Sequence, residues 1–285
     1  MKVLVTGANG QVGRALQAVA PAGAVITPTD VGDLDITDAA AVDAFVGVLG
    51  PQLIVNAAAY TAVDKAESDE ALAQRINADA VANLAAAARA HGAKLAHIST
   101  DFVFDGTSGS PYAVDAVPNP LSVYGGTKLA GEVAAGPESL IVRTSWVYAA
   151  AGGNFVHTML RLMRERDELR VVADQIGTPT YATGIAEAIF GLASQGLSGI
   201  FHFTDSGAAS WYDFAVAIQE EALAIGLLDR EARIVPIATS DYPTPARRPS
   251  YSVLDKTATI AALGGPAPHW RANLRRMLAE VKANG

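Results

Sequence analysis

Tyr124 and Lys128 stand four residues apart in the stretch VYGGTKLAG at 123–131, a spacing that makes them neighbours on a helix. A tyrosine phenol has a pKa of about 10 and is a poor acid–base catalyst at neutral pH, but a nearby ammonium stabilises the phenolate and lowers that pKa. The same ammonium can bond the ribose hydroxyls of a nicotinamide nucleotide. Because surface pairs with this spacing are common, the interpretation depends on what surrounds the pair.

Two glycines, Gly125 and Gly126, separate the tyrosine from the lysine. Each glycine costs a helix interior about 1 kcal/mol relative to alanine. Their presence predicts that Tyr124 lies at or near the N-terminus of its helix, where few intrahelical hydrogen bonds can be lost. Glycine there would also let a substrate and a nicotinamide approach closely. We expect Tyr124 to face Thr100 across the cofactor.

Two hydroxyl groups end an expected strand in the stretch HISTDFVFDG at 97–106. Ser99 and Thr100 fall at the carboxyl end of that strand, which is the side on which ligands bind in open parallel sheets. A hydroxyl there can hydrogen-bond a substrate carbonyl and orient it toward a phenol and a hydride. We assign this catalytic role to Thr100, and capping of the strand is enough to explain the other hydroxyl.

The stretch TGANGQVG at 6–13 follows the first expected strand and opens the first expected helix. Its glycines, Gly7, Gly10 and Gly13, have the spacing G-x-x-G-x-x-G. Such glycines permit a tight turn, close approach of the backbone to a pyrophosphate, and close packing of helix on strand, while the helix N-terminus attracts the phosphates. An ordinary strand-to-helix turn is the alternative. With strand, turn and helix all in place, we predict a dinucleotide site.

Asp30 follows the second expected strand, 17 residues after Gly13, near the place where an acid would bond an adenosine ribose hydroxyl. A carboxylate favours NAD over NADP because it repels a 2′-phosphate, whereas Arg14 at the helix start could offset that preference. The choice between NADH and NADPH therefore stays open. The expected cofactor contacts are Gly7, Gly10, Gln11, Val12, Gly13, Asp30, Asp35, Ile36, Ala57, Ala58, Ala59, Tyr60 and Lys128.

Short β-branched segments alternate with alanine-rich helical segments along the first half of the chain. We expect strands at 2–6, 24–27, 53–57, 94–99 and 140–144, and helices near 11–20, 38–49, 69–91 and 124–135. Alternation of apolar strands with helices predicts a parallel sheet that is covered on both faces. The expected fold class is therefore α/β, with a Rossmann-type doubly wound sheet.

The regularity loosens after about residue 145. The expected elements are a helix at 154–170, the segment VVAD at 171–174, a helix at 183–195, a strand at 199–204, a helix at 210–224, a loop at 242–249 and a last helix at about 270–282. We expect a dinucleotide-binding domain at 1–145 and a smaller lobe at 146–285 that mainly binds substrate. Some later elements should return to the first domain.

The composition limits the classes of function. Half of the 285 residues are apolar, 18 % are charged and the net charge is −8, which indicates a soluble globular protein without general affinity for nucleic acid or anionic membranes. The absence of cysteine excludes disulfides and thiolate metal sites, which suits a reducing compartment. No apolar stretch approaches the ~18–20 residues of a membrane span, and the N-terminal apolar segment is too short for a secretory signal. We expect a cytoplasmic location.

Six segments together resemble the extended short-chain dehydrogenase/reductases. They are the glycine-rich turn at 6–13, NAAAYTAVDKAES at 56–68, STDFVFDG at 99–106, the Y-x-x-x-K segment, RTSWVY at 143–148 and DQIGTPT at 174–180. The resemblance covers essentially the whole chain. AAYTAVDKAE and RTSWVY are its most specific segments, and they are typical of the branch that reduces dTDP-linked 4-keto sugars.

This resemblance implies that NADPH or NADH gives a hydride to C4 of a dTDP-linked 4-keto sugar. Tyr124 would protonate the developing alkoxide, Lys128 would tune Tyr124 and hold the ribose, and Thr100 would polarise the ketone. The residues that would contact the substrate are Thr100, Asp101, Tyr124, Trp146, Asn154, Gln175, Arg247 and Arg248. The two arginines would bind the diphosphate, because a guanidinium group suits phosphate oxygens. The alternative is that they are a solvated pair on a loop. The protein could also form a homodimer.

Other functions share parts of this pattern. Relatives that bind magnesium at a dimer interface have a glutamate just after the third glycine, where this chain has Arg14 and Ala15, so we expect no metal site. A sugar-nucleotide epimerase or dehydratase is the nearest rival, but dehydratases need an Asp-Glu pair directly after the catalytic hydroxyl, and here Phe102 follows Asp101. A non-catalytic NADP-binding regulatory subunit is the alternative from another class, and the intact catalytic set argues against it.

Overall fold

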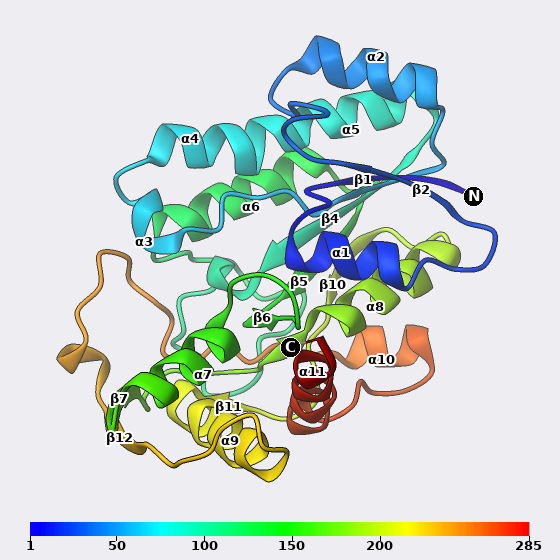
Figure 1. Ribbon diagram of the computed structural model, residues 1–285. Coiled ribbons are helices and arrows are strands. Elements are labelled where there is room, and N and C mark those ends of the chain that lie inside the picture. The colour runs from blue at the N-terminus through cyan, green and yellow to red at the C-terminus, as the bar shows by residue number, and fades with distance from the viewer. Residues whose placement is uncertain (285) are drawn as a thin grey trace.

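Six parallel strands form the central sheet of the computed structural model, which describes residues 1–284 (Figure 1). The strands are β1 (Lys2–Thr6), β2 (Val25–Thr29), β3 (Leu53–Asn56), β4 (Lys94–Thr100), β5 (Leu140–Thr144) and β10 (Gly199–His202). Their order across the sheet is β10-β5-β4-β3-β1-β2, with β2 at one edge and β10 at the other. The predicted α/β class with a parallel sheet is therefore confirmed.

Helices cover both faces of this sheet, as the apolar strands predicted (Figure 1). Along β1, the side chains of Val3 and Val5 pack with one helix layer and that of Leu4 packs with the other, because successive residues of a strand face opposite sides. The first layer contains α1 (Gln11–Ala18) and α8 (Ala182–Ser194). The second contains α2 (Ala39–Leu49), α5 (Ala80–His91) and α6 (Val123–Ala135).

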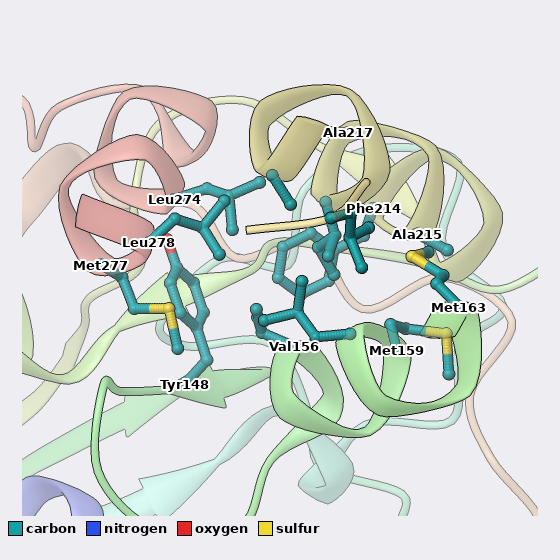
Figure 2. Close-up of a cluster of buried hydrophobic side chains, with 14 of the residues drawn as sticks. Tyr148, Val156, Met159, Met163, Phe214, Ala215, Ala217, Leu274, Met277 and Leu278 are labelled. Atoms are coloured by element: carbon teal, nitrogen blue, oxygen red, sulfur yellow. The ribbon is translucent and has the colours of Figure 1, made fainter. Parts of the chain in front are cut away.

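A separate apolar core lies in the second half of the chain, between α7 (Phe155–Glu165), α9 (Trp211–Ala224) and α11 (Trp270–Asn284). Figure 2 shows Val156 of α7, Phe214 of α9 and Leu274 of α11 directed toward one another. Elements from this half also contact the first sheet, since β10 pairs with β5 and α8 packs on α1. Among residues 1–284, no helix has both the length and the apolarity needed to cross a membrane.

The helix expected at 69–91 is interrupted by a turn of π-helix. The chain forms α4 (Glu70–Gln74), then the π-helical turn Arg75–Asp79, and then α5. In the π-helical turn the buried Asn77 accepts a hydrogen bond from the backbone N–H of Tyr60 at 2.8 Å and donates to its carbonyl at 3.1 Å. Sequence periodicity does not show this bulge or the contact of its Asn77 with Tyr60.

The helix expected at 154–170 ends at Glu165, so the last part of that prediction was wrong. The following residues form β7 (Glu168–Val172), which pairs in parallel with β12 (Arg233–Ile237). Leu169 and Val171 are buried while their neighbours are more exposed, which is the alternation of a strand. Besides β12, the elements not expected from sequence include α3 (Val63–Ala66), β6 (Val147–Tyr148), β8 (Ile176–Gly177), β9 (Thr180–Tyr181), β11 (Ala209–Ser210) and α10 (Thr257–Leu263).

Candidate active site

A cleft of about 1060 Å³ lies at the carboxyl ends of β1, β3, β4 and β5. Because β2 and β3 lie on opposite sides of β1, the chain changes direction across the sheet at this point, which is where open α/β sheets bind ligands. Most of the predicted site residues border it. They are Gly7, Gly10, Gln11, Val12, Asp30, Asp35, Ile36, Ala57, Ala58, Ala59, Thr100, Asp101, Tyr124, Lys128, Trp146, Asn154 and Arg248.

The glycine-rich turn has the geometry of a phosphate cradle. Gly7 has a φ of +66°, and a Cβ there would lie 2.6 Å from the backbone N of Ala58. A Cβ on Gly13 would lie 2.2 Å from the Gly7 carbonyl oxygen, so this third glycine lets the helix pack on the strand although it does not border the cleft. Gly10 caps α1 without a side chain, which leaves the N–H groups of the first turn to an anion. The turn therefore fits the diphosphate of a dinucleotide.

Two carboxylates order the far end of the cleft. Asp30 accepts hydrogen bonds from the backbone N–H of Asn9 at 3.0 Å and of Val31 at 2.9 Å. Asp35 accepts from the hydroxyl and the N–H of Thr37, and these bonds hold the pKa of the Asp35 carboxyl below its ordinary value. Both carboxylates border the cleft, and their contact with the adenosine half of a dinucleotide stays a prediction.

Thr100 and Asp101 form a buried polar pair on the cleft wall. The Thr100 hydroxyl donates to Asp101 Oδ1 at 3.0 Å and accepts from the backbone N–H of Phe102 at 3.2 Å. Asp101 is 1 % exposed, and its Oδ2 has no hydrogen-bond partner within residues 1–284. Burial raises the pKa of the Asp101 carboxyl to about 6. An unsatisfied buried acceptor beside the cleft is a polar atom that a ligand hydroxyl could pair.

Tyr124 is the second residue of α6, which confirms the position that the two glycines predicted. Ser122 caps this helix by accepting the backbone N–H of Gly125 at 3.2 Å. The tyrosine ring packs edge-on against Phe102, with ring centroids 5.5 Å apart. These contacts fix the phenol at the start of the helix, beside the end of β4.

The expectation that Lys128 lowers the pKa of Tyr124 is not met in this structure. Burial raises the pKa of the Tyr124 phenol to about 12, and the Thr100 hydroxyl is the group that opposes this rise. The Lys128 ammonium instead donates to the carbonyl of Ile98 at 2.6 Å and lies 3.4 Å from Nε2 of His97. The phenol is therefore protonated at neutral pH, which is the form that an acid catalyst requires.

Gly125 and Gly126 have different surroundings. A Cβ on Gly125 would lie 2.3 Å from the Phe102 carbonyl oxygen, whereas one on Gly126 would meet nothing within 4 Å. Gly125 therefore permits contact of α6 with the turn after β4, and not the approach of a ligand that the sequence suggested.

We expect Gly125→Ala to lower the free energy of unfolding by about 1–3 kcal/mol, since a backbone atom must move. Gly126→Ala should raise it by about 0.5–1 kcal/mol through helix propensity. Urea unfolding of the two variants measures this difference. Equal changes in the free energy of unfolding at both positions would show that the close packing of Gly125 against Phe102 does not contribute to stability.

Four predicted site residues lie outside the cleft lining: Gly13, Tyr60, Gln175 and Arg247. Gly13 serves the packing of the glycine-rich turn. The Tyr60 hydroxyl donates to Asp69 at 3.1 Å, and the amide of the buried Gln175 donates to the Thr239 hydroxyl at 3.0 Å. Arg247 is exposed on its loop. The structure thus gives Tyr60 and Gln175 partners within the protein, which a sequence motif does not reveal.

Arg248 borders the cleft, but a carboxylate already holds its guanidinium. Its Nη1 and Nη2 donate to the two oxygens of Asp64 at 3.0 and 2.8 Å, and Asp64 also accepts the backbone N–H of Ala246 at 3.2 Å. This pair joins the loop at 242–249 to α3. The diphosphate role expected for Arg248 stays a prediction, and in this structure the fork that suits a phosphate faces Asp64.

If the ion pair acts by holding this loop over the cleft, Asp64→Asn and Arg248→Met should raise KM for the substrate by a similar factor. Both side chains are partly exposed, so we expect about fivefold, which corresponds to about 1 kcal/mol. Arg247→Met should leave KM unchanged. Steady-state measurement of KM for the substrate in the three variants tests this expectation. An increase in the Arg248→Met variant alone would mean that Arg248 contacts the substrate and that Asp64 is dispensable.

Sequence reasoning missed an aromatic wall of the cleft. The Trp211 ring stacks on Trp146 with centroids 3.5 Å apart and planes 6° apart. Trp146 has a φ of +48°, an uncommon conformation for a residue other than glycine, and it presses its ring against Gly177. Trp211 starts a helix and carries no motif of its own. Other lining residues that were missed include Asn9, Thr61, Arg75, Thr144, Ser145 and Val147.

Asn154 connects the glycine-rich turn to the second half of the chain. Its side-chain oxygen caps α7 by accepting the N–H of His157 at 3.2 Å. Its Nδ2 donates to the Gln11 side chain at 3.0 Å and to the Ala149 carbonyl at 2.8 Å. Because Gln11 begins the helix after the glycine-rich turn, Asn154 closes the cleft against the phosphate cradle.

Comparison with known proteins gives one consistent result. The family model described as RmlD substrate binding domain matches residues 1–283. A curated relative from Burkholderia thailandensis, a dTDP-4-dehydrorhamnose reductase, is 45% identical, with 95% of this chain and 96% of that protein covered.

Solved structures agree with that comparison. A dTDP-4-dehydrorhamnose reductase from Clostridium acetobutylicum superposes with a TM-score of 0.93 at 42% identity, over 99% of this chain and 100% of the other. The same enzyme from Bacillus anthracis, in complex with NADP, superposes with a TM-score of 0.92 at 39% identity, over 98% of this chain and 99% of the other.

Proposed function

The chain belongs to the dTDP-4-dehydrorhamnose reductase family, and we propose that it reduces the C4 ketone of dTDP-4-dehydro-L-rhamnose to give dTDP-L-rhamnose. The observation that carries this proposal is the cleft, which brings Thr100, Tyr124 and Lys128 together at the carboxyl edge of the sheet beside the phosphate cradle. The cofactor is NADPH or NADH, in keeping with the NADP bound by the Bacillus anthracis relative.

Each catalytic residue of the cleft has a separate role in the proposed reaction. The nicotinamide supplies the hydride when it is bound. The Thr100 hydroxyl can donate to the ketone oxygen and polarise it, provided that it turns from Asp101. The Tyr124 phenol, protonated at neutral pH, gives its proton to the alkoxide that forms at C4. Lys128 stands one helical turn away on the cleft lining, where its ammonium would hold the ribose hydroxyls of the bound cofactor.

Cofactor consumption tests the proposal directly. With dTDP-4-dehydro-L-rhamnose as substrate, the protein should oxidise one NADPH or NADH for each dTDP-L-rhamnose formed, measured by absorbance and by chromatography of the product. A dehydratase or epimerase would convert a sugar nucleotide without net oxidation of the cofactor. Failure to oxidise either cofactor would refute the reductase function.

Three finer expectations remain predictions. The net charge of −8 supports the absence of nucleic-acid and membrane partners. A sugar-nucleotide substrate supports a cytoplasmic location, which fractionation would test. The homodimer is a prediction that sedimentation equilibrium would check.

A further inference from the structure

Lys128 is a buried ammonium without a counterion of its own. It is 2 % exposed, and its Nζ donates to the neutral carbonyl of Ile98 at 2.6 Å. Glu132 lies one turn further along α6, but Arg143 donates to both of its oxygens, at 2.8 and 2.7 Å, and Ser99 donates to one of them. The charge of Glu132 is therefore already balanced. Within residues 1–284, no carboxylate lies within ion-pair distance of Lys128.

The other close neighbour of Lys128 is His97, a buried ring that the proposed reaction does not use. It is 1 % exposed, and its Nε2 lies 3.4 Å from the Lys128 Nζ. Its Nδ1 lies 3.1 Å from the side-chain nitrogen of Asn56. His97 therefore stands between an ammonium on one side and an amide on the other, and the amide decides which ring nitrogen bears the proton.

Asn56 has a fixed orientation. Its Oδ1 accepts from the backbone N–H of Ala58 at 3.1 Å and from the Thr6 hydroxyl at 2.7 Å. A backbone N–H can only donate, so the atom that faces Ala58 must be the oxygen, and the NH₂ group must face His97. The Nδ1 of His97 then has to accept. His97 is neutral as a result, and its proton is on Nε2.

The Nε2–H of His97 consequently points at the Nζ of Lys128. An ammonium has three N–H groups and no lone pair, so two donors face each other across 3.4 Å. A neutral amine at the same place would accept the Nε2–H. The Nε2–H of His97 therefore favours the neutral amine of Lys128 over the ammonium.

We propose that His97 is a positioning residue that sets the proton affinity of Lys128, and that Asn56 fixes the tautomer through which it acts. The proposal rests on the proposed reductase function, in which the charged Lys128 is the active form. His97 then determines the upper end of the pH range in which the ketone is reduced.

Burial is the main cause of the pKa shifts of both groups, and the Glu132 charge opposes the shift of Lys128. Burial lowers the pKa of Lys128 to about 8, and burial together with the nearby ammonium lowers the pKa of His97 well below its ordinary value. Below its pKa Lys128 is charged, so the rate of reduction should fall as the pH rises through that value. The titratable and charged groups on α6 and on the elements packed against it include Tyr124 and Glu132 on α6 itself, His97 on β4 and Asp101 after it, Arg143 on β5, Glu67 after α3, and Arg75 and Asp79 in the π-helical turn.

The pH profile of kcat/KM for the His97→Gln variant tests the proposal. A glutamine amide can turn its oxygen toward the ammonium and stabilise it, so the alkaline limb should move upward by about one pH unit. His91→Gln is the matched control, because His91 lies at the C-terminal end of α5 in an exposed pair with Asp43. Its alkaline limb should coincide with that of the unchanged protein.

Two results would overturn the proposal. An unmoved limb in His97→Gln would mean that His97 only packs, and a downward shift would mean that its ring accepts from the ammonium and stabilises the charge. Should the variant not fold, nitrogen-15 NMR of the unchanged protein reports the tautomer directly. The chain has five histidines, and glutamine variants of the other four assign the His97 signals.

We expect a neutral ring with its proton on Nε2 from about pH 6 to pH 9. An Nδ1–H tautomer or an imidazolium signal would refute the mechanism. This measurement needs no substrate, so it remains informative if the protein fails to reduce the dTDP-linked sugar.

Discussion

Tyr124→Phe is expected to lower kcat for reduction of the 4-keto sugar by about 10²–10⁴-fold, the range for loss of a positioned general acid. The phenol is the proton donor at C4, and its raised pKa of about 12 keeps it protonated over the working pH range. Phenylalanine removes only the hydroxyl. The ring should keep its edge-on contact with Phe102, so the fold and the cleft should be unchanged.

The comparison of kcat with binding makes this prediction specific. NADPH affinity, measured by fluorescence titration, should change little in Tyr124→Phe, because the cradle at the glycine-rich turn is intact. Tyr242→Phe is the matched control, since Tyr242 is 61% exposed on the loop at 242–249 and should keep full activity. A Tyr124→Phe variant with normal kcat would show that another group delivers the proton. Full cellular function in that variant would favour a regulatory subunit.

The parts of the site that sequence could predict are those that local spacing encodes. Gly7 and Gly13 stand where backbone contacts exclude any side chain, so the requirement is visible in a short segment. The tyrosine at the start of its helix follows in the same way from the two glycines after it. Local geometry at these places requires a residue type at a fixed distance, and that spacing can be recognised in the sequence.

The parts that sequence missed depend on contacts between distant segments. Arg248 binds Asp64, which lies 184 positions earlier, and no local feature of the proline-rich loop indicates that partner. The same is true of Trp211, whose stacking on Trp146 forms the aromatic wall. Ser99, which could have been a simple strand cap, instead donates to the buried Glu132. Pairings of this kind are set by the tertiary fold.

Breaking the buried ion pair of Arg143 and Glu132 should strongly destabilise the protein. Both side chains are almost fully buried, and two hydrogen bonds of 2.8 and 2.7 Å join them. Arg143→Met leaves the Glu132 carboxylate uncompensated, so we expect the free energy of unfolding to fall by about 3–5 kcal/mol. The double variant Arg143→Met with Glu132→Gln should recover most of that loss, because no buried charge remains.

Urea unfolding of the single and double variants measures both effects, and Arg161→Met supplies the control. Arg161 pairs with Glu165 on an exposed helix surface, so its loss should cost at most about 0.5 kcal/mol. A double variant as unstable as Arg143→Met would show that packing, and not the unpaired charge, is responsible. The folded Arg143→Met protein offers a second readout, since an unbalanced Glu132 one turn from Lys128 should raise the pKa of that ammonium. The alkaline limb of its kcat/KM profile should therefore move to higher pH, as in His97→Gln. The causes differ: here the Glu132 carboxylate on α6 stabilises the ammonium, whereas in His97→Gln the ring on β4 has been replaced.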